Sequence, residues 1–560
     1  MRPAPLRNVT WLAPAALLFL VPPSPSASAR QASPTSQASQ TSQAPSRASV
    51  LRGEYGPYRA NNDLLYYHLD IRIDPATKTI GGKNTIRFRM LEDGNRIQLD
   101  LYDNLTVDKI LMGATPLKYT RELNAVFVDF GETLRKGREY SIDFHYSGTP
   151  RQQGRFGGFV FGQAPSGKPW VFTACEGEGA SIWWPNKDQW RDEPSSMDIS
   201  IAVPNGLSDA SNGRFMGSKD LGDGFTQWNW RVNYPINSYN VSVNITDYQH
   251  FADKLGDVTL DYYVTPANLE KAKTQFAQAK PMIEAFKHFF GEYPFAKDGY
   301  KLIEVPYTGM EHQSAVTYGN GFENGYGGRD WTGVGISPKF DFIIIHESGH
   351  EWFGNAVSAA DVSDMWIQEG WCTYLEGLYV EHIFGYADGI KYLNGYKSKV
   401  QNRTPIIRTR GIHQSPQGND QYFKGALFLN TLRSVVNDDK KWWAIVRGTY
   451  DTFKYRNIMT EDMVRYFNQQ TGRDLTGIFN QYLRRTELPT LELVFNAPAG
   501  TVTYRWIADE PGFAMPVRVG SKAAWQTVEA TTEPKTMKTA LTPETFEVAT
   551  DLFYVNVTKK

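Results

Sequence analysis

The chain has 560 residues, enough for two to four domains, because a single hydrophobic core stops growing well below this length. Hydrophobic residues make up 41% of the chain and aromatic residues 14%, which excludes a disordered or fibrous protein. The 59 Lys and Arg residues nearly balance the 60 Asp and Glu residues, and a net charge of -1 provides no overall field that would attract nucleic acid.

The first residues have the pattern of an export signal. Arg2 and Arg7 precede an apolar stretch over residues 11–21, and an A-x-A cleavage site follows at residues 27–29. The apolar stretch is about half as long as a helix that spans a bilayer, which argues against a permanent anchor. We therefore expect residues 1–29 to be a signal peptide. The mature protein should be exported, either periplasmic or secreted, with no transmembrane segment.

Three regions of different pattern follow a linker. Residues 30–50 are rich in Ser, Gln and Pro and contain almost nothing to bury, so we expect a flexible linker. Over residues 51–250, short alternating runs such as YYHLDIRID and YSIDFHY predict a β-rich domain. Residues 251–488 shift to a helical period, and residues 489–560 return to strand patterns such as LELVFNA. The sequence therefore predicts an α+β multidomain protein.

The chain has only two cysteines, Cys175 and Cys372. This number is too small for a disulfide-stabilised scaffold. A bond between the two is an open alternative, but a pair of buried free thiols is the favoured state.

The segment HESGH at residues 346–350 is the strongest local signal in the chain. A helix places residues four apart on one face, so the imidazoles of His346 and His350 can reach one tetrahedral metal ion. Glu347 follows the first histidine and flanks that ion at a distance suited to a role through water. This spacing predicts a metal site on a helix.

Two helices are expected to carry the metal ligands. The first lies within residues 337–357, where Ser337 can cap it. The second runs over residues 365–384 and carries Glu369, which follows His350 after eighteen intervening residues. Consecutive helices joined by a short loop bring this carboxylate to the open side of the two imidazoles.

Two imidazoles and one carboxylate form the ligand set of a catalytic zinc site. They leave the fourth tetrahedral position to water, whereas a structural zinc site is closed by a fourth side chain, usually Cys. We therefore expect one Zn²⁺ per chain, held by His346, His350 and Glu369. Because zinc acidifies water and polarises a carbonyl, Glu347 can take a proton from the water and deliver it to the leaving nitrogen.

These motifs resemble the aminopeptidase N family of gluzincin aminopeptidases, peptidase family M1. The resemblance rests on four ordered segments, TGMEHQSAV, HESGHEWFGNAV, WIQEGWCTYLE and QYFKGAL, and covers nearly all of the chain after the linker. It implies a saddle-like N-terminal β-domain, a thermolysin-like catalytic domain and a small C-terminal domain of β-sandwich type. It also implies a zinc-dependent aminopeptidase, which hydrolyses N-terminal residues from peptides with a free N-terminus.

The resemblance also implies a site for the α-ammonium group of the substrate. Glu311, in TGMEH, would bind this group, because a carboxylate gives the strongest hydrogen bonds to an ammonium. Gly309 and Met310 would run along the substrate backbone. A second carboxylate is expected from the CEGEG segment, as Glu176 or, as the competing choice, Glu178.

Two further positions bear on catalysis. Tyr422, in the Y-x-K-G segment, would donate a hydrogen bond to the developing oxyanion. His312 departs from the family pattern, which usually has Asn at this position, so its role in substrate binding is in doubt. Since histidine titrates near neutrality, His312 can instead tune the amine site electrostatically.

Other functions use parts of the same motif. A zinc endopeptidase shares the water chemistry but needs no amine-binding carboxylates, so Glu311 and Glu176 argue against it. A noncatalytic peptide-binding protein with a structural zinc is expected to lack Glu347 or Tyr422, and both are present. Epoxide hydrolysis is known in one branch of the family, but nothing in this sequence favours it. The sequence makes no prediction about oligomeric state or side-chain preference.

Overall fold

A computed structural model of the chain describes residues 44–414 and 418–560. The expected signal peptide, residues 1–29, lies outside the described residues. Residues 45–560 form one compact unit.

The first element of this unit overlaps the expected linker. Helix α1 (Arg47–Gly53) begins after Ser46, whose side chain accepts a hydrogen bond from the backbone of the first turn, and Leu51 is buried. A cap and a buried leucine give this segment reasons to be helical that its polar composition hides. The last residues of the range 30–50 are therefore part of a helix.

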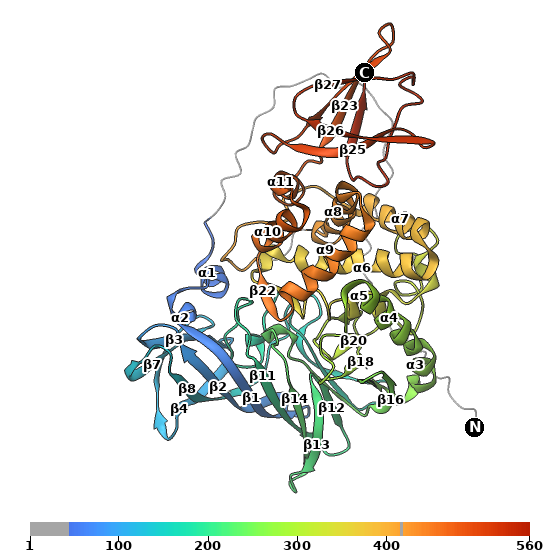
Figure 1. Cartoon of the computed structure of the whole chain (residues 1–560). Coiled ribbons are helices and arrows are strands. Elements are labelled where there is room, and N and C mark those ends of the chain that lie inside the picture. The colour runs from blue at the N-terminus through green and yellow to red at the C-terminus, as the bar shows by residue number, and fades with distance from the viewer. Residues whose placement is uncertain (1–43, 415–417) are drawn as a thin grey trace, which may run out of the picture. The chain divides into compact units, whose positions relative to one another are not determined.

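Most of the N-terminal region is a sheet of eight strands, and a short helix α2 (Pro57–Ala60) precedes it (Figure 1). In β1 the alternating residues Tyr67, Leu69 and Ile71 are buried, as expected for a strand with one face against a core. Strand β1 pairs with β2 in antiparallel and with β11 in parallel orientation. In spatial order the strands are β13 (Arg214–Asp220), β14 (Phe225–Val232), β11 (Ser196–Pro204), β1 (Asn62–Asp74), β2 (Thr79–Met90), β8 (Glu139–Gly148), β4 (Leu105–Met112) and β5 (Thr115–Pro116).

Two smaller sheets complete this region. One contains β3 (Gly94–Asp100), β7 (Ala125–Leu134) and β6 (Lys118–Glu122). The other contains β12 (Ser208–Ser211), β15 (Val243–Thr246), β10 (Pro169–Ala174) and β9 (Gly158–Gln163). Strand β10 leads directly into the CEGEG loop and so fixes where Glu176 leaves the sheet.

The next region begins with a five-stranded sheet that supports the metal-binding motif. In spatial order its strands are β16 (Gln249–Leu255), β17 (Val258–Val264), β18 (Tyr300–Glu304), β20 (Val316–Tyr318) and β19 (Gly309–Met310). Strands β16 and β17 form an antiparallel hairpin, so the predicted boundary at residue 250 falls inside β16. Strand β19 lies at the edge of the sheet.

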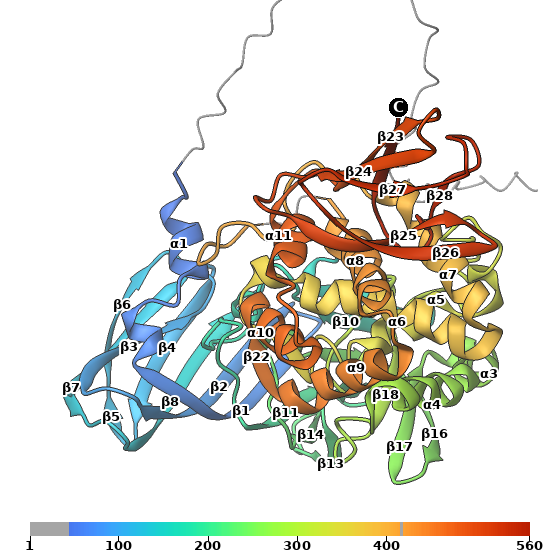
Figure 2. The same cartoon turned by 45° about the horizontal axis from the view of Figure 1, so that its top comes forward.

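Helices make up most of the remaining region (Figures 1 and 2). Helix α6 packs against α5 and α8. Gly370 on α6 faces Gly425 on α8, and a Cβ built on Gly370 would lie 3.2 Å from the Gly425 Cα, so the two helices approach closely where neither has a side chain. The helices are α3 (Leu269–Gln275), α4 (Ala279–Phe290), α5 (Phe342–Gly349), α6 (Trp366–Phe384), α7 (Tyr386–Gly395), α8 (Asp420–Val436), α9 (Asp439–Phe453), α10 (Thr460–Thr471) and α11 (Thr476–Arg484).

Within the helical region, β21 (Val357–Ala359) and β22 (Arg456–Ile458) form a two-stranded ladder. The C-terminal residues form two small sheets. One contains β27 (Lys535–Lys538), β24 (Thr501–Ile507), β23 (Thr490–Asn496) and β29 (Asn556–Lys559). The other contains β26 (Ala524–Thr531), β25 (Ala514–Ser521) and β28 (Glu547–Val548). The predicted α+β class, with β-rich regions on either side of a mainly helical one, is confirmed.

Two further predictions concern cysteines and membrane spans. Cys175 and Cys372 are both buried and free, so the favoured state is confirmed. Among the described residues, no helix has the length and apolar character required to cross a membrane.

Candidate active site

Helix α5 carries the HESGH motif and begins later than the sequence suggested. Asp341 caps it, because its Oδ1 accepts hydrogen bonds from the backbone N–H of Ile343 and Ile344, at 3.0 and 3.3 Å. Ser337, the predicted cap, instead starts a separate one-turn 3₁₀ helix that ends at Lys339. An acidic cap is apt here, since the positive end of the helix dipole favours a carboxylate.

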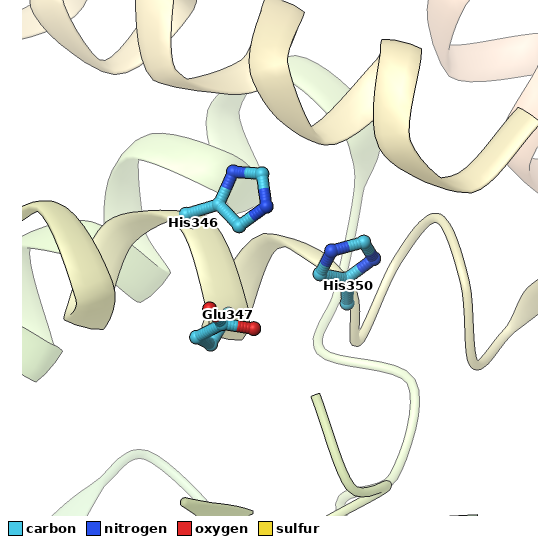
Figure 3. Close-up of side chains that lie close together, drawn as sticks. All are labelled: His346, Glu347 and His350. Carbon is cyan, nitrogen blue, oxygen red and sulfur yellow. The ribbon is translucent and has the colours of Figure 1, made fainter. Parts of the chain in front are cut away.

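The Nε2 atoms of His346 and His350 face the same position, beside the carboxylate of Glu369. Figure 3 shows both imidazoles and Glu347 at the end of α5, and the two ring centroids lie 5.1 Å apart. Each Nδ1–H donates to an oxygen behind the ring, from His346 to Glu376 Oε1 at 2.7 Å and from His350 to the backbone oxygen of Phe353 at 3.1 Å. These bonds fix the tautomers and leave each Nε2 lone pair free for a metal.

Glu369 on α6 completes the ligand set. Its Oε2 lies 3.5 Å from Nε2 of His346 and 3.3 Å from Nε2 of His350. Ligands about 2.0–2.1 Å from a tetrahedral zinc lie about 3.3–3.4 Å apart, so the three atoms have the spacing of a zinc site. The same Oε2 is buried without a hydrogen-bond partner. A bound cation would satisfy this atom, and the residues present therefore fit zinc.

The Glu347 carboxylate also lies near the ligand nitrogens of His346 and His350, but at a wider spacing than Glu369. Its carboxylate and the ligand nitrogens of His346 and His350 lie within 4.8 Å of one another. We assign Glu369 rather than Glu347 as the third ligand, because only Glu369 is shown at ligand spacing from both imidazoles. Burial raises the pKa of Glu347 to about 7, more than the two histidines lower it. A carboxylate with this pKa is suited to accept and return a proton near neutral pH.

Strand β19 runs along α5 on the side of Glu347. A Cβ built on Gly309 would lie 2.7 Å from Ile343 Cγ2 and 3.1 Å from Glu347 Cγ, so only glycine allows the strand to lie this close to the helix. Met310 follows and lines the cavity in front of the histidines. Gly309 and Met310 therefore line the cavity beside α5, and their contact with the substrate backbone stays a prediction.

Glu311 and Glu176 face the same cavity from different regions of the chain. Tyr239 donates a 2.8 Å hydrogen bond to Glu311 Oε1, whereas Glu176 Oε1 is buried without a partner. Burial, followed by the repulsion from Glu311, raises the pKa of Glu176 well above its usual range. Burial likewise raises the pKa of Glu311. Carboxyl groups whose charged form is disfavoured by burial are matched by a ligand that carries positive charge.

The two candidates in the CEGEG loop, Glu176 and Glu178, have different surroundings in the structure. Glu176 lines the cavity, whereas the Oε2 of Glu178 accepts a 2.7 Å hydrogen bond from the side chain of Gln153 and is not among the residues that line the cavity. Glu176 is therefore the second carboxylate at the site.

Tyr422 on α8 lines the cavity beside His346, and the centroids of the two rings lie 6.1 Å apart. Burial and the nearby Glu369 raise the pKa of the Tyr422 phenol well above its usual value. The phenol therefore keeps its proton and can act as a hydrogen-bond donor.

His312 is separated from the cavity that its neighbours line. It is fully buried, both ring nitrogens lack a hydrogen-bond partner, and burial lowers its pKa to about 3. The ring is therefore neutral, so it does not supply the electrostatic tuning that titration near neutrality would allow.

The cavity that these residues share has a volume of ≈ 130 Å³. The three metal-binding side chains, Glu347, Tyr422 and the two amine-site carboxylates all line it. Other residues that the sequence did not single out also line it, among them the aromatic residues Phe156, Tyr326, Trp331, Phe342 and Phe423. Of these aromatic residues only Phe423 falls in a recognised segment, QYFKGAL; the others lie in loops or at the first residue of α5 and share no spacing pattern.

Comparison with known families agrees with this geometry. The model described as the Peptidase M1 N-terminal domain matches residues 64–240, and the model described as the Peptidase family M1 domain matches residues 274–482. The chain belongs to peptidase family M1. Both matched regions contribute to the site: Glu176 and the hydrogen-bond donor Tyr239 come from the first, and Glu311 and the histidines come from the second.

Similar curated proteins are named as aminopeptidases. Probable aminopeptidase 2 of Sulfurisphaera tokodaii is 24% identical over 47% of this chain and 34% of its own length. Aminopeptidase B of Rattus norvegicus is 22% identical over 83% of this chain and 77% of its own length. The chain thus spans about a third of the first of these relatives and about three quarters of the second.

The fold matches solved M1 structures. The M1 zinc metallopeptidase from Deinococcus radiodurans is 21% identical, with a TM-score of 0.64 over 76% of this chain and 95% of its own. A mutant of that enzyme, bound to a Tyr-Ser-Ala substrate, gives a TM-score of 0.63 at 21% identity over 76% of this chain and 94% of its own. This likeness supports the M1 fold.

Proposed function

We propose that the protein is a zinc-dependent aminopeptidase that removes N-terminal residues from peptides. The observation that carries this proposal is the pair of carboxyl groups, those of the buried Glu311 and the half-buried Glu176, in the same small cavity as the metal-binding atoms. The curated relatives are named as aminopeptidases, which supports the same activity.

The amine site defines which bond is cut. Glu311 and Glu176 place two carboxyl groups where an α-ammonium group can bind, and burial raises the pKa of both, so a negative charge there is costly until a cation matches it. A peptide with a free N-terminus supplies the matching charge, whereas an acetylated one does not. With the ammonium fixed there, the carbonyl of the first residue lies next to the histidines, so the first peptide bond is the reactive one.

The chemistry divides among three groups of the chain. We propose that His346, His350 and Glu369 hold one zinc ion, which when bound supplies Lewis acidity for a water molecule and for the scissile carbonyl. Glu347 accepts a proton from the attacking water and returns it to the leaving nitrogen. Tyr422 donates its phenolic proton in a hydrogen bond to the carbonyl oxygen as negative charge develops there.

A zinc endopeptidase is the alternative within the same chemistry. It cuts inside a chain and has no free ammonium to bind, so it would leave Glu311 and Glu176 as two buried charges without a partner. A peptide-binding protein with a structural zinc does not need a base at the position of Glu347. The geometry therefore favours the aminopeptidase.

The test compares one peptide with and without an N-terminal acetyl group. We expect the protein to cleave only the free form, from its N-terminal end, and to lose activity when a chelator removes the metal. Cleavage of the acetylated peptide at an internal bond would show an endopeptidase. Full activity without metal would contradict the assigned mechanism.

We also propose that the protein is exported, on the basis of the sequence pattern in residues 1–29. Expression of the full chain in a Gram-negative host, followed by fractionation and N-terminal sequencing, tests this. The expected mature protein begins near residue 30 and is found outside the cytoplasm. An uncleaved cytoplasmic protein would contradict the proposal.

A further inference from the structure

The two ends of the cavity can be assigned from their positions along helix α5. Glu311 lies toward the C-terminal end of the helix, where the Asn355 side chain donates to the Glu311 backbone oxygen at 2.7 Å. Asn355 is itself tied to His350 by a 2.9 Å backbone hydrogen bond. Gly309 lies further back along the helix, against Ile343. The amine site is therefore at the end of the cavity near His350, and the other end lies near the start of α5.

Aromatic side chains line that other end. We call Tyr326, Trp331, Phe342 and Phe423 the aromatic wall; all four line the cavity. Tyr326 stacks on Trp331 with centroids 4.7 Å apart, and Trp331 lies 6.0 Å from Phe342 and 6.4 Å from Phe423. Phe342 in turn stacks on the His346 ring at 5.4 Å. The aromatic wall therefore extends to His346, which lies farther from the proposed amine site than His350 does.

The wall is held in place by contacts outside the cavity. The ammonium of Lys399 lies 3.8 Å from the centroid of the Trp331 ring, within the range of a cation–π interaction. Phe423 stacks on Tyr396 with centroids 4.9 Å apart. Aromatic rings fixed in this way offer a preformed apolar surface, so a ligand side chain that packs on them loses little further entropy in the protein.

Glu376, an acidic residue that also lines the cavity, is already fully engaged. Glu376 Oε1 accepts the proton of His346 Nδ1, and Glu376 Oε2 accepts hydrogen bonds from the phenols of Tyr392 and Tyr396. This carboxylate therefore does not offer a partner to a basic substrate side chain. The wall is therefore suited to an apolar side chain rather than a basic one.

We propose that the aromatic wall selects the second residue of the substrate and favours an aromatic or large apolar side chain there. This inference rests on the proposed function, because it takes Glu311 and Glu176 as the anchor of the N-terminal amine. With the amine near His350 and the reactive carbonyl at the histidines, the chain beyond the scissile bond extends past His346 toward Phe342. The side chain of the second residue is the first that can reach the wall.

The test uses three peptides with the same first residue: Leu-Phe-Gly, Leu-Gly-Gly and Leu-Lys-Gly. We expect kcat/KM for Leu-Phe-Gly to exceed that for Leu-Gly-Gly by about tenfold or more, and Leu-Lys-Gly to be the poorest substrate. Equal kcat/KM for all three would overturn the inference but leave the aminopeptidase assignment intact. Failure to cleave any peptide with a free N-terminus would instead contradict the proposed function.

Substitutions in the aromatic wall test whether it causes the preference for an apolar second residue. Trp331→Ala should reduce the ratio of kcat/KM for Leu-Phe-Gly over Leu-Gly-Gly to near one. Trp228→Ala is the matched control, because Trp228 is also a half-buried tryptophan but lies in β14 and does not line the cavity. If Trp331→Ala fails to fold, Phe423→Leu tests the same surface and should lower the same ratio. An unchanged ratio in a folded wall variant would contradict the proposal.

Discussion

The phenol of Tyr239 donates a 2.8 Å hydrogen bond to Oε1 of Glu311, and the two residues are 72 positions apart in the chain. Tyr239 lies in a 3₁₀ turn (Ser238–Asn240) of the region that matches the M1 N-terminal domain, and only 1% of it is exposed. The neighbouring Asn240 donates to Asn355 Oδ1 at 2.8 Å. Glu311, the proposed amine ligand, is therefore positioned by contacts between the two matched regions.

Tyr239→Phe tests this positioning role. Removing the hydroxyl leaves Glu311 Oε1 without its buried donor, so the carboxylate should bind the substrate amine less well. We expect KM for a free-amine peptide to rise, with kcat/KM lower by about tenfold, which corresponds to ~1.4 kcal/mol. Steady-state kinetics with free and acetylated peptides give the KM and the discrimination between them.

Tyr146→Phe is the matched control for that variant. Tyr146 is equally buried in the N-terminal region, but its hydroxyl has no hydrogen-bond partner. This control should keep the kinetics of the wild type. If both variants change kcat/KM equally, the effect comes from packing and the positioning role of Tyr239 is wrong.

Tyr422→Phe tests the oxyanion donor. The phenol acts on charge that develops only in the transition state, so its loss should lower kcat by about 100-fold to 1,000-fold with little change in KM. Pre-steady-state or steady-state turnover of an aminoacyl-nitroanilide measures this. A rise in KM at constant kcat would show instead that Tyr422 only binds the substrate.

Glu376→Gln tests the support of the metal site. Glu376 accepts the Nδ1 proton of His346, and loss of its negative charge weakens the donor strength of Nε2. We expect the affinity for zinc to fall by about 10-fold to 100-fold, measured by competition with a chromogenic chelator. Thermal unfolding of the metal-free variant serves as the control. A zinc affinity equal to that of the wild type would show that Glu376 does not support the site.

The metal-binding residues could be predicted because their spacing follows from helix geometry. His346 and His350 share one face of a helix, and Glu369 follows on the next helix, so local sequence was sufficient. The cap of α5 was predicted wrongly, because Ser337 and Asp341 are both good cap residues and only tertiary contacts decide between them. Asp341 is the one held by hydrogen bonds from Gln275 and Tyr318.

Other parts of the site could not be read from the sequence. Helix α5 ends at Gly349 rather than near residue 357, because the chain turns after His350 and Gly354 adopts a φ of 137°. The choice between Glu176 and Glu178 depends on which carboxylate a Gly-rich loop turns into the cavity. Tyr239 and the aromatic wall depend on contacts between distant segments, which leave no spacing pattern in the chain.

The central claim is that Glu347 acts as the base beside a zinc ion that His346, His350 and Glu369 hold. Its most direct test measures zinc content and peptide turnover together in the Glu347→Gln variant. We predict one zinc per chain, as in the wild type, and a kcat lower by about 100-fold to 10,000-fold. A variant that holds zinc and turns over peptide at the wild-type rate would contradict the claim.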